Sequence, residues 1–168
     1  MALDAQILLS ILAHETSSGD ISRTLRATPA SYSLSLSDGT GANQAQVVWS
    51  DSRTIPAEAV EDIDLQSLSD DRGVVSFSAV KVLYIKNTHA SVQIDIRQGV
   101  SLANSWDWIG YAADDGLGET VVPAGGCIMV AAPTAAGVSV ADDRKIIRIV
   151  AAAGVTYEII LIGEGTVT

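Results

Sequence analysis

The stretch Val74–Asn87, VVSFSAVKVLYIKN, decides the fold, because apolar residues occupy both faces of the β-strand that it predicts. One face would carry Val80, Val82, Tyr84 and Lys86, and the other Phe77, Ala79, Lys81, Leu83 and Ile85. A strand that is apolar on both faces lies in the centre of a sheet or at an interface. The length of this strand also predicts a bend or a bulge.

Further short strands are predicted on both sides of this stretch, because apolar and polar residues alternate through most of the chain. They are Tyr32–Leu36, Gln46–Ile55, Glu61–Leu65, Ser91–Ile96, Trp106–Trp108, Glu119–Val122, Gly126–Ala132, Arg144–Ala151 and Val155–Ile162. Asp38-Gly39 predicts a tight turn, and Asn87–Ala90 predicts a hairpin turn. About nine or ten strands without intervening helices predict an all-β fold, a closed two-sheet sandwich or a barrel, with less than about a tenth of the residues in helix.

The first residues of the chain fit two kinds of structure. A helix face would carry Leu3, Ile7, Leu8, Ile11 and Leu12, and a strand face would carry Ala5, Ile7, Leu9 and Ile11. We prefer an edge strand, because isoleucine and the turn-forming Thr16–Gly19 favour it. We divide the chain into an N-terminal strand or arm, residues 1–30, and a sandwich domain, residues 31–168, which together form one structural unit.

The alternation also predicts which side chains are buried, either in one subunit or between subunits. These are Val82, Leu83, Ile85, Val92, Ile94, Ile96, Ile128, Val130, Ile147, Ile149, Ile159 and Leu161.

The composition argues against nucleic-acid and membrane partners. Twenty acidic against ten basic residues give a net charge of -10, which repels phosphates. The longest uncharged stretch, Thr120–Ala141, contains prolines and glycines that would interrupt a membrane helix, so it predicts strands and turns. No basic segment precedes the apolar residues of the N-terminus, so we expect no secretory signal.

The sequence offers little for catalysis, and we expect neither an enzyme nor a cofactor. His14 and His89 are far apart in the sequence, and each lies near a predicted turn. Cys127, the single cysteine, excludes an internal disulfide and has apolar neighbours that favour a small core residue over a nucleophile. The acidic pairs Asp70-Asp71, Asp114-Asp115 and Asp142-Asp143 lie in predicted loops, where solvated charge is favoured over a calcium site.

Trp106 and Trp108 flank Asp107, so both rings would lie on one side of a strand, with Tyr111 nearby. This arrangement has two interpretations. One is packing in the core or at a subunit interface, which we favour because large aromatic side chains contribute most area when buried. The other is stacking on sugar rings, as in a carbohydrate-binding module.

The order of several phrases resembles a group of small tailed-bacteriophage virion structural proteins. The phrases are Leu34–Ala45 (LSLSDGTGANQA), Val48–Ile55 (VWSDSRTI), Glu61–Leu65 (EDIDL), Val80–Thr88 (VKVLYIKNT), Val121–Gly126 (VVPAGG) and Tyr157–Gly163 (YEIILIG). The resemblance covers about residues 32–163. It implies an antiparallel two-sheet β-sandwich of the jelly-roll type that capsid decoration, or cement, proteins use.

The resemblance implies a non-enzymatic protein that is made in the bacterial host cytoplasm and binds the major capsid protein on the outer face of the virion. A homo-oligomer is expected, because sandwich edges need cover, and a trimer at a threefold point is favoured. The candidate interface residues are Leu3, Ile7, Ile11, Arg23, Arg26, Arg53, Trp106 and Trp108, with the acidic loops at Asp70-Asp71 and Asp114-Asp115. A tail, neck or fibre component and the carbohydrate-binding module are the alternatives.

Overall fold

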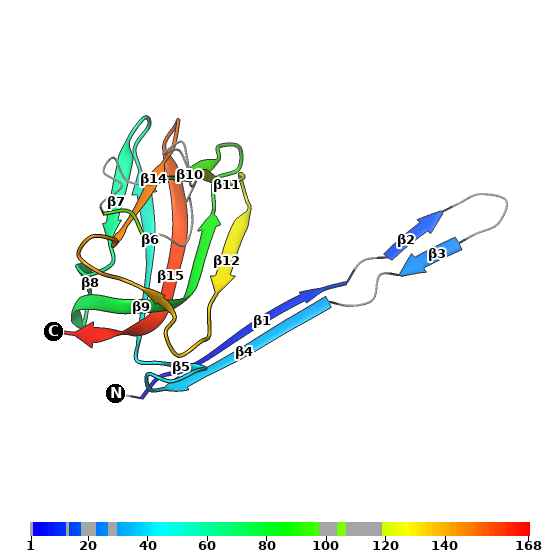
Figure 1. Cartoon of the computed structure of the whole chain (residues 1–168). Helices are drawn as coiled ribbons and strands as arrows, with labels where there is room; N and C mark the ends of the chain where they lie inside the picture. The colour runs from blue at the N-terminus through cyan, green and yellow to red at the C-terminus, as the bar shows by residue number, and fades with distance from the viewer. Residues whose placement is uncertain (1, 13, 18–22, 27–29, 98–103, 107–118) are drawn as a thin grey trace.

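The computed structural model of the chain describes residues 2–12, 14–17, 23–26, 30–97, 104–106 and 119–168, and none of these residues is helical (Figure 1). The strands are β1 (Asp4–Ile11), β2 (His14–Ser17), β3 (Arg23–Arg26), β4 (Ala30–Asp38), β5 (Gln44–Ala45), β6 (Val47–Ile55), β7 (Val60–Asp64), β8 (Leu68–Asp70), β9 (Gly73–Asn87), β10 (Ile94–Arg97), β11 (Glu119–Val122), β12 (Cys127–Ala131), β13 (Val138–Ser139), β14 (Ile146–Val150) and β15 (Val155–Val167). The all-β prediction is confirmed. The described residues form more strands than the nine or ten expected, because the arm contributes β2 and β3 and because the short strands β5, β8 and β13 pair with longer ones.

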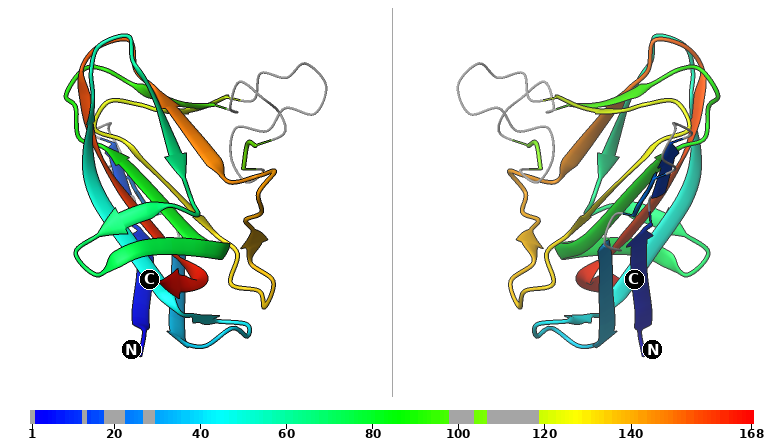
Figure 2. Two further views of the ribbon diagram at one scale, coloured as in Figure 1. Left: turned by 90° about the vertical axis from the view of Figure 1, so that its left-hand side faces the viewer. Right: turned by 90° about the vertical axis from the view of Figure 1, so that its right-hand side faces the viewer.

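Ten strands form a sandwich of two antiparallel sheets, seen as two layers in Figure 2. One sheet has the order β12-β9-β15-β6, with β8 and β13 added beside β9, and the other has the order β11-β10-β14-β7. The chain therefore behaves as a long hairpin rolled into a sandwich: β6 pairs with β15, β7 with β14, β9 with β12, and β10 with β11. This nested pairing is the jelly-roll arrangement, in which successive main strands alternate between the sheets except β10 and β11, which pair with each other.

The predicted hairpin at Asn87–Ala90 is wrong, because β9 and β10 belong to different sheets. The buried side chain of Asn87 donates hydrogen bonds to the carbonyl groups of Val92 and Val122. The hydroxyl of Thr88 donates to the carbonyl of Thr156 at 2.7 Å. These bonds hold the chain in a crossover between the sheets, which local turn chemistry does not distinguish from a hairpin.

The main core fills the space between the two sheets. Of the twelve side chains predicted to be buried, nine are buried: Val82, Leu83, Ile85, Ile94, Ile96, Ile147, Ile149, Ile159 and Leu161. Val92, Ile128 and Val130 are partly buried against the same core. Of the two predicted positions for this strand, the central one is confirmed, since β9 lies between β12 and β15. Leu83 faces the main core, and Val82 faces a second core on the outer side of the sheet.

The predicted irregularity in β9 lies where it pairs with β15, at two register shifts next to Gly163 and Gly165. A Cβ atom on Gly163 would lie 2.1 Å from the carbonyl oxygen of Ala79, and one on Gly165 would lie 2.2 Å from that of Ser76. Glycine permits this close approach of two backbones. The strand consequently runs five residues past the predicted end at Ile162, to Val167.

The N-terminal region forms a two-stranded antiparallel hairpin that projects from one end of the sandwich (Figure 1). β1 pairs with β4 from Asp4–Ser37 to Ile11–Ala30, and β2 pairs with β3 further out. The preference for a strand at the N-terminus is confirmed. The second strand of the hairpin, β4, lies in the range that the sequence analysis places with the sandwich.

Candidate interaction surface: the hairpin arm

The hairpin of β1 and β4 has one face that is apolar along its whole length. At its root this face carries Leu3, Ala5, Ile7, Leu34 and Leu36, which pack with Ala45, Val82 and Ile162 to form the second core. Further out, on the same face, Leu9 lies opposite Tyr32 and Ile11 lies opposite Ala30. No part of the described chain covers this outer part: Leu9 is 47% exposed, Ile11 57% and Tyr32 38%.

The opposite face of the hairpin also presents leucine to solvent. Leu8 is 71% exposed and lies opposite Ser33, and Leu12, just beyond the end of β1, is 70% exposed. Ser10 and Ser31 lie between them. The arm therefore exposes large apolar side chains on both of its faces, and exposed apolar surface of this kind marks interaction sites. Because an isolated two-stranded hairpin is marginally stable in water, the arm is expected to gain order from a partner.

The outer face of the six-stranded sheet is likewise apolar beyond the second core. Ala131, Val82 and Ile162 form a row across β12, β9 and β15 beneath the hairpin. The next row, two residues along each strand, consists of Met129, Tyr84 and Ile160, which are paired in register. Ile160 also packs against the second core, so this row directly continues it. These three side chains are partly exposed. The row after that is polar, with an ion pair between Lys86 and Glu158 beside the exposed Cys127.

A buried lysine fixes the root of the arm. The side chain of Lys81, in β9, is fully buried, and its Nζ lies 2.9 Å from a carboxylate oxygen of Glu164 in β15. The same nitrogen donates a 2.8 Å hydrogen bond to the carbonyl of Gly41, in the loop that joins β4 to β5. A buried ammonium group is tolerated only when it is paired and hydrogen-bonded, so this contact anchors the loop at one defined place on the sandwich.

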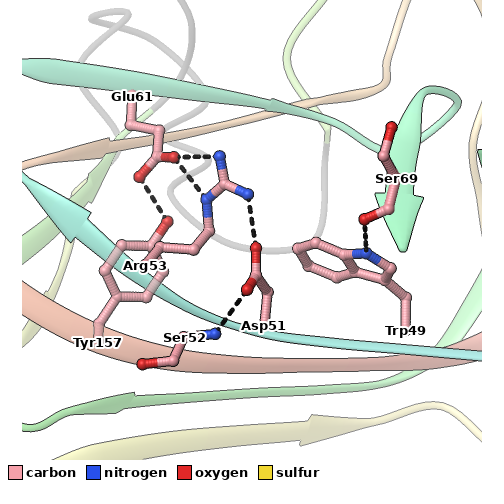
Figure 3. Close-up of polar contacts among 7 residues, drawn as sticks. All are labelled: Trp49, Asp51, Ser52, Arg53, Glu61, Ser69 and Tyr157. Atoms are coloured by element: carbon pink, nitrogen blue, oxygen red, sulfur yellow. Dashed lines mark hydrogen bonds and ion pairs between the residues drawn. The ribbon is translucent and has the colours of Figure 1, made fainter. Parts of the chain in front are cut away.

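At the other end of the sandwich, charged side chains tie the edge strands of the two sheets together (Figure 3). Arg53 of β6 donates to Glu61 of β7 at 2.5 Å and to Asp51 at 2.9 Å. The second oxygen of Glu61 accepts a 2.7 Å hydrogen bond from the hydroxyl of Tyr157 in β15. The predicted interface residue Arg53 therefore has two acidic partners within its own chain.

Burial controls the ionisation of this cluster. Desolvation of the buried phenol, followed by its hydrogen bond to the Glu61 carboxylate, raises the pKa of Tyr157 well above its usual range. Partial burial alone would lower the pKa of Arg53, but the hydrogen bond and the charge of Glu61 outweigh it and raise that pKa. The phenol of Tyr157 is therefore neutral and the guanidinium of Arg53 is charged at neutral pH, which suits a structural tie between the sheets.

A cleft of about 430 Å³ opens beside this cluster. Its lining residues are Trp49, Arg53, Asp62, Ile63, Asp64, Ser67, Leu68 and Ser69. The charged groups in it already have partners: Arg148 binds Asp62 through two hydrogen bonds of 2.6 and 2.5 Å, and Lys145 lies 3.3 Å from Asp64. The indole nitrogen of Trp49 donates to the carbonyl of Ser69. These contacts hold β6, β7, β8 and β14 together.

The cysteine and histidines considered above as possible catalytic or metal-binding residues lie on strands or in the crossover between the sheets. Cys127 is exposed on the edge strand β12, so its predicted place in the core is wrong. The Nδ1 atom of His89 accepts hydrogen bonds from the backbone amides of Ser91 and Val92, which stabilises the crossover. His14 lies in β2, opposite Arg26. The described ranges contain no group of three or more side chains placed to hold a metal ion.

Two of the three acidic pairs, Asp70-Asp71 and Asp142-Asp143, lie among the described residues. Asp70 forms a 2.5 Å ion pair with Arg72, which also donates to the carbonyl of Val48. The hydrogen bonds from Arg72 lower the pKa of Asp70. The pair Asp142-Asp143 lies in the turn before β14. Asp114-Asp115 lies outside the described residues.

The position of Trp106 contradicts the hypothesis that its ring stacks on sugars. Its side chain is 2% exposed within the single chain and belongs to the main core, where the indole nitrogen donates to the carbonyl of Ser139 at 3.1 Å. The prediction of Trp106 as an interface residue is therefore wrong, and its ring is not available for stacking on a sugar. Core packing, one part of the favoured interpretation, is confirmed for it. Trp108 and Tyr111 lie outside the described residues.

The remaining predicted interface residues lie on the arm. Leu3 and Ile7 are partly buried against the second core of their own chain, whereas Ile11 is exposed. Arg23 and Arg26 lie on β3, at the outer part of the hairpin. Their roles at an interface stay predictions.

Sequence reasoning missed the outer row of Met129, Tyr84 and Ile160, and it missed the anchor at Lys81. The alternation of β12 and β15 was a usable signal for the row, because it places these side chains opposite the predicted core residues Ile128, Ile159 and Leu161. Nothing in the sequence pairs Lys81 with Glu164.

No family model, no curated protein and no solved structure matches this chain. Among the described residues, no helix meets the length and hydropathy needed to cross a membrane.

Proposed function

We propose that this chain is a non-enzymatic structural protein of a bacteriophage virion, a decoration or cement protein that binds the outer face of the major capsid lattice and stabilises it. The observation that carries the proposal is the hairpin arm: it extends past the sandwich and exposes leucine or isoleucine on both faces. A bare apolar strand pair of this kind invites aggregation unless a partner covers it. A virion protein has such partners in repeating copies.

The sandwich supports the proposal as a rigid base for the arm. Lys81 anchors the root of the hairpin, and at the opposite end the ion pair of Arg53 with Glu61 joins the two sheets. The ion pair of Arg148 with Asp62 joins β14 to β7 within one sheet. These ion pairs and hydrogen bonds stabilise the fold of the sandwich. The sequence resemblance to jelly-roll decoration proteins points to the same role.

In this proposal, binding of the protein stabilises the capsid by mass action. A protein that binds the assembled lattice more tightly than its dissociated subunits stabilises the lattice by its differential affinity. The arm suits this task, because an extended apolar strand pair reaches over a boundary between neighbouring capsomers. In this proposal the protein acts as a homotrimer at a threefold point, with the major capsid protein as its partner.

The two faces of the arm suggest a division of contacts. Leu8 and Leu12 point away from the second core, so they are the side chains that remain available to the capsid when the other face is covered. Replacing them by serine removes apolar contact area without changing the face that packs on the sandwich.

The test is co-sedimentation of the purified protein with undecorated capsids of the phage that encodes it, followed by heating of the particles. Binding should raise the temperature at which the capsids break, and Leu8→Ser with Leu12→Ser should weaken binding at least tenfold. Val60→Ser, which alters an exposed side chain at the opposite end of the sandwich, is the matched control and should bind as the parent does.

Two outcomes would overturn the proposal. One is the absence of binding to capsids at any protein concentration tested. The other is labelling of tails, necks or fibres, instead of heads, in electron micrographs of intact particles stained with an antibody to this chain.

A further inference from the structure

The second core is formed by two apolar surfaces that both continue beyond the place where they meet. One is the hairpin face, which runs on from Ile7 to Leu9 and Ile11. The other is the outer sheet face, which runs on from Val82 to Tyr84. Within one chain the two continuations do not meet, because the hairpin projects away from the sandwich (Figure 1).

We infer that these two continuations meet between copies of the chain: Leu9, Ile11 and Tyr32 of one copy dock on the row of Met129, Tyr84 and Ile160 of a second copy. The contact would extend the packing already present in the second core, where leucines of the same hairpin face cover the neighbouring row of the same sheet face. The inference deepens the proposed homo-oligomer by assigning its contact surface.

The dimensions of the two surfaces agree. A row across three strands spans about 10 Å, since neighbouring strands lie about 4.8 Å apart. On the arm, Leu9 and Ile11 are separated by about 7 Å along β1, and Tyr32 lies one strand away on β4. The row is bounded on its far side by the polar pair of Lys86 and Glu158, which gives the apolar contact a defined edge.

Charge also favours the arm as the contacting element. Residues 1–30 carry three acids and two arginines, whereas residues 31–168 carry seventeen acids and eight lysines or arginines. Two sandwiches in direct contact would bring together most of the negative charge of both copies. A nearly neutral arm on a neighbouring sandwich keeps the charged bodies further apart and reduces this repulsion.

The contact joins two different surfaces of the chain, so each copy offers one arm and accepts one. If the copies form a closed ring, every arm is docked on a neighbouring sandwich. The smallest such ring is a dimer in which the two copies exchange arms. A trimer is one such ring. Leu8 and Leu12 remain on the uncovered face, where the proposed capsid contact lies.

The test uses the single cysteine as a probe. Cys127 lies on the outer sheet face, two residues from Met129, and is exposed. The parent chain is co-expressed with the double variant Leu9→Cys/Cys127→Ser, so that each copy has one thiol and any link between positions 9 and 127 joins two copies. A short bis-maleimide is added, and linked peptides are identified by mass spectrometry.

Links between positions 9 and 127 are expected to form in high yield. The matched control is Ser10→Cys/Cys127→Ser, which moves the thiol to the opposite face of the hairpin and should give at least tenfold less product. Equal yields from both positions would overturn the inference, as would products that join only position 9 to position 9.

A second measurement needs no introduced cysteine, so it tests the inference even if Leu9→Cys disturbs the arm. Sedimentation equilibrium should show an oligomer for the parent chain, and Leu9→Ser with Ile11→Ser should raise its dissociation constant at least tenfold. Leu8→Ser should leave that constant unchanged. A parent chain that is monomeric at the highest concentration would overturn the inference. Because no capsid is present in either assay, this result stands apart from a failure to bind capsids.

Discussion

The contact between Lys81 and Glu164 gives the sharpest test of how the arm is anchored. The ammonium group is fully buried, it lies 2.9 Å from the carboxylate, and it donates a 2.8 Å hydrogen bond to the carbonyl of Gly41. Lys81→Met keeps the length and most of the volume of the side chain while removing the charge. The carboxylate of Glu164, whose side chain is only 18% exposed, is then left without its cation.

The expected cost follows from the burial of the pair. Removing one partner of a buried ion pair costs about 3–5 kcal/mol, and the partial exposure of Glu164 places the loss near the lower end, at about 3 kcal/mol. For a chain of this length, the midpoint of thermal unfolding should fall by about 6–12 °C. Lys86→Met is the matched control, because Lys86 lies on the same strand in an exposed pair with Glu158 and should cost less than about 1 kcal/mol.

The measurement is urea unfolding followed by circular dichroism, at one fixed protein concentration because self-association contributes to apparent stability. The double variant Lys81→Met/Glu164→Leu removes both charges and should recover most of the loss, since an apolar pair often replaces a buried ion pair without cost. Amide exchange in the loop around Gly41 should accelerate in the single variant. A loss below about 1 kcal/mol for Lys81→Met, or a double variant as unstable as the sum of the single ones, would refute the reasoning.

Three further predictions concern the sandwich. Gly163→Ala should destabilise the fold by at least about 1–3 kcal/mol in urea unfolding, because its Cβ atom would lie 2.1 Å from the carbonyl oxygen of Ala79, whereas Gly154→Ala, with no heavy atom nearer than 3.9 Å, should cost far less. The raised pKa of Tyr157 contributes stability that is fully present below about pH 10, the value of an unfolded tyrosine, and is lost as the pH rises toward the folded pKa. Between pH 8 and pH 11.5, the free energy of unfolding should therefore fall more steeply for the parent chain than for Tyr157→Phe. An equal fall for both proteins would contradict the raised pKa of Tyr157. Trp106→Ala should cost about 3–5 kcal/mol in the same urea assay, and an unchanged midpoint would show that this indole is not part of the core.

Most of the sandwich could be predicted from local patterns. The alternation in Val47–Ile55 and Ile146–Val150 identifies strands, because a half-buried strand must expose alternate side chains. The end of β15 could not be predicted, since Gly163-Glu164-Gly165 has the composition of a turn. Only the close approach of the β9 backbone explains why glycine occurs there inside a strand.

The candidate interaction surface could also be predicted only in part from the sequence. The sequence proposed Leu3, Ile7 and Ile11 as apolar interface residues, and of these three only Ile11 is exposed. It could not separate Ile7, which packs on the second core, from Ile11, which extends beyond it. The two residues have the same chemistry and lie on the same strand face, so their exposure depends on where the sandwich ends.

By itself, the sequence determined the fold class and the strands of the sandwich, because both follow from interactions between residues that are close along the chain. The tertiary structure decided which strands pair, that Asn87–Ala90 crosses between the sheets, and that Lys81 meets Glu164 and Gly41 at the root of a projecting hairpin. These features depend on residues up to 116 positions apart, as with Val47 and Gly163, which pair in β6 and β15. Local side-chain preferences contain no information about such distant partners, so only packing in three dimensions selects them.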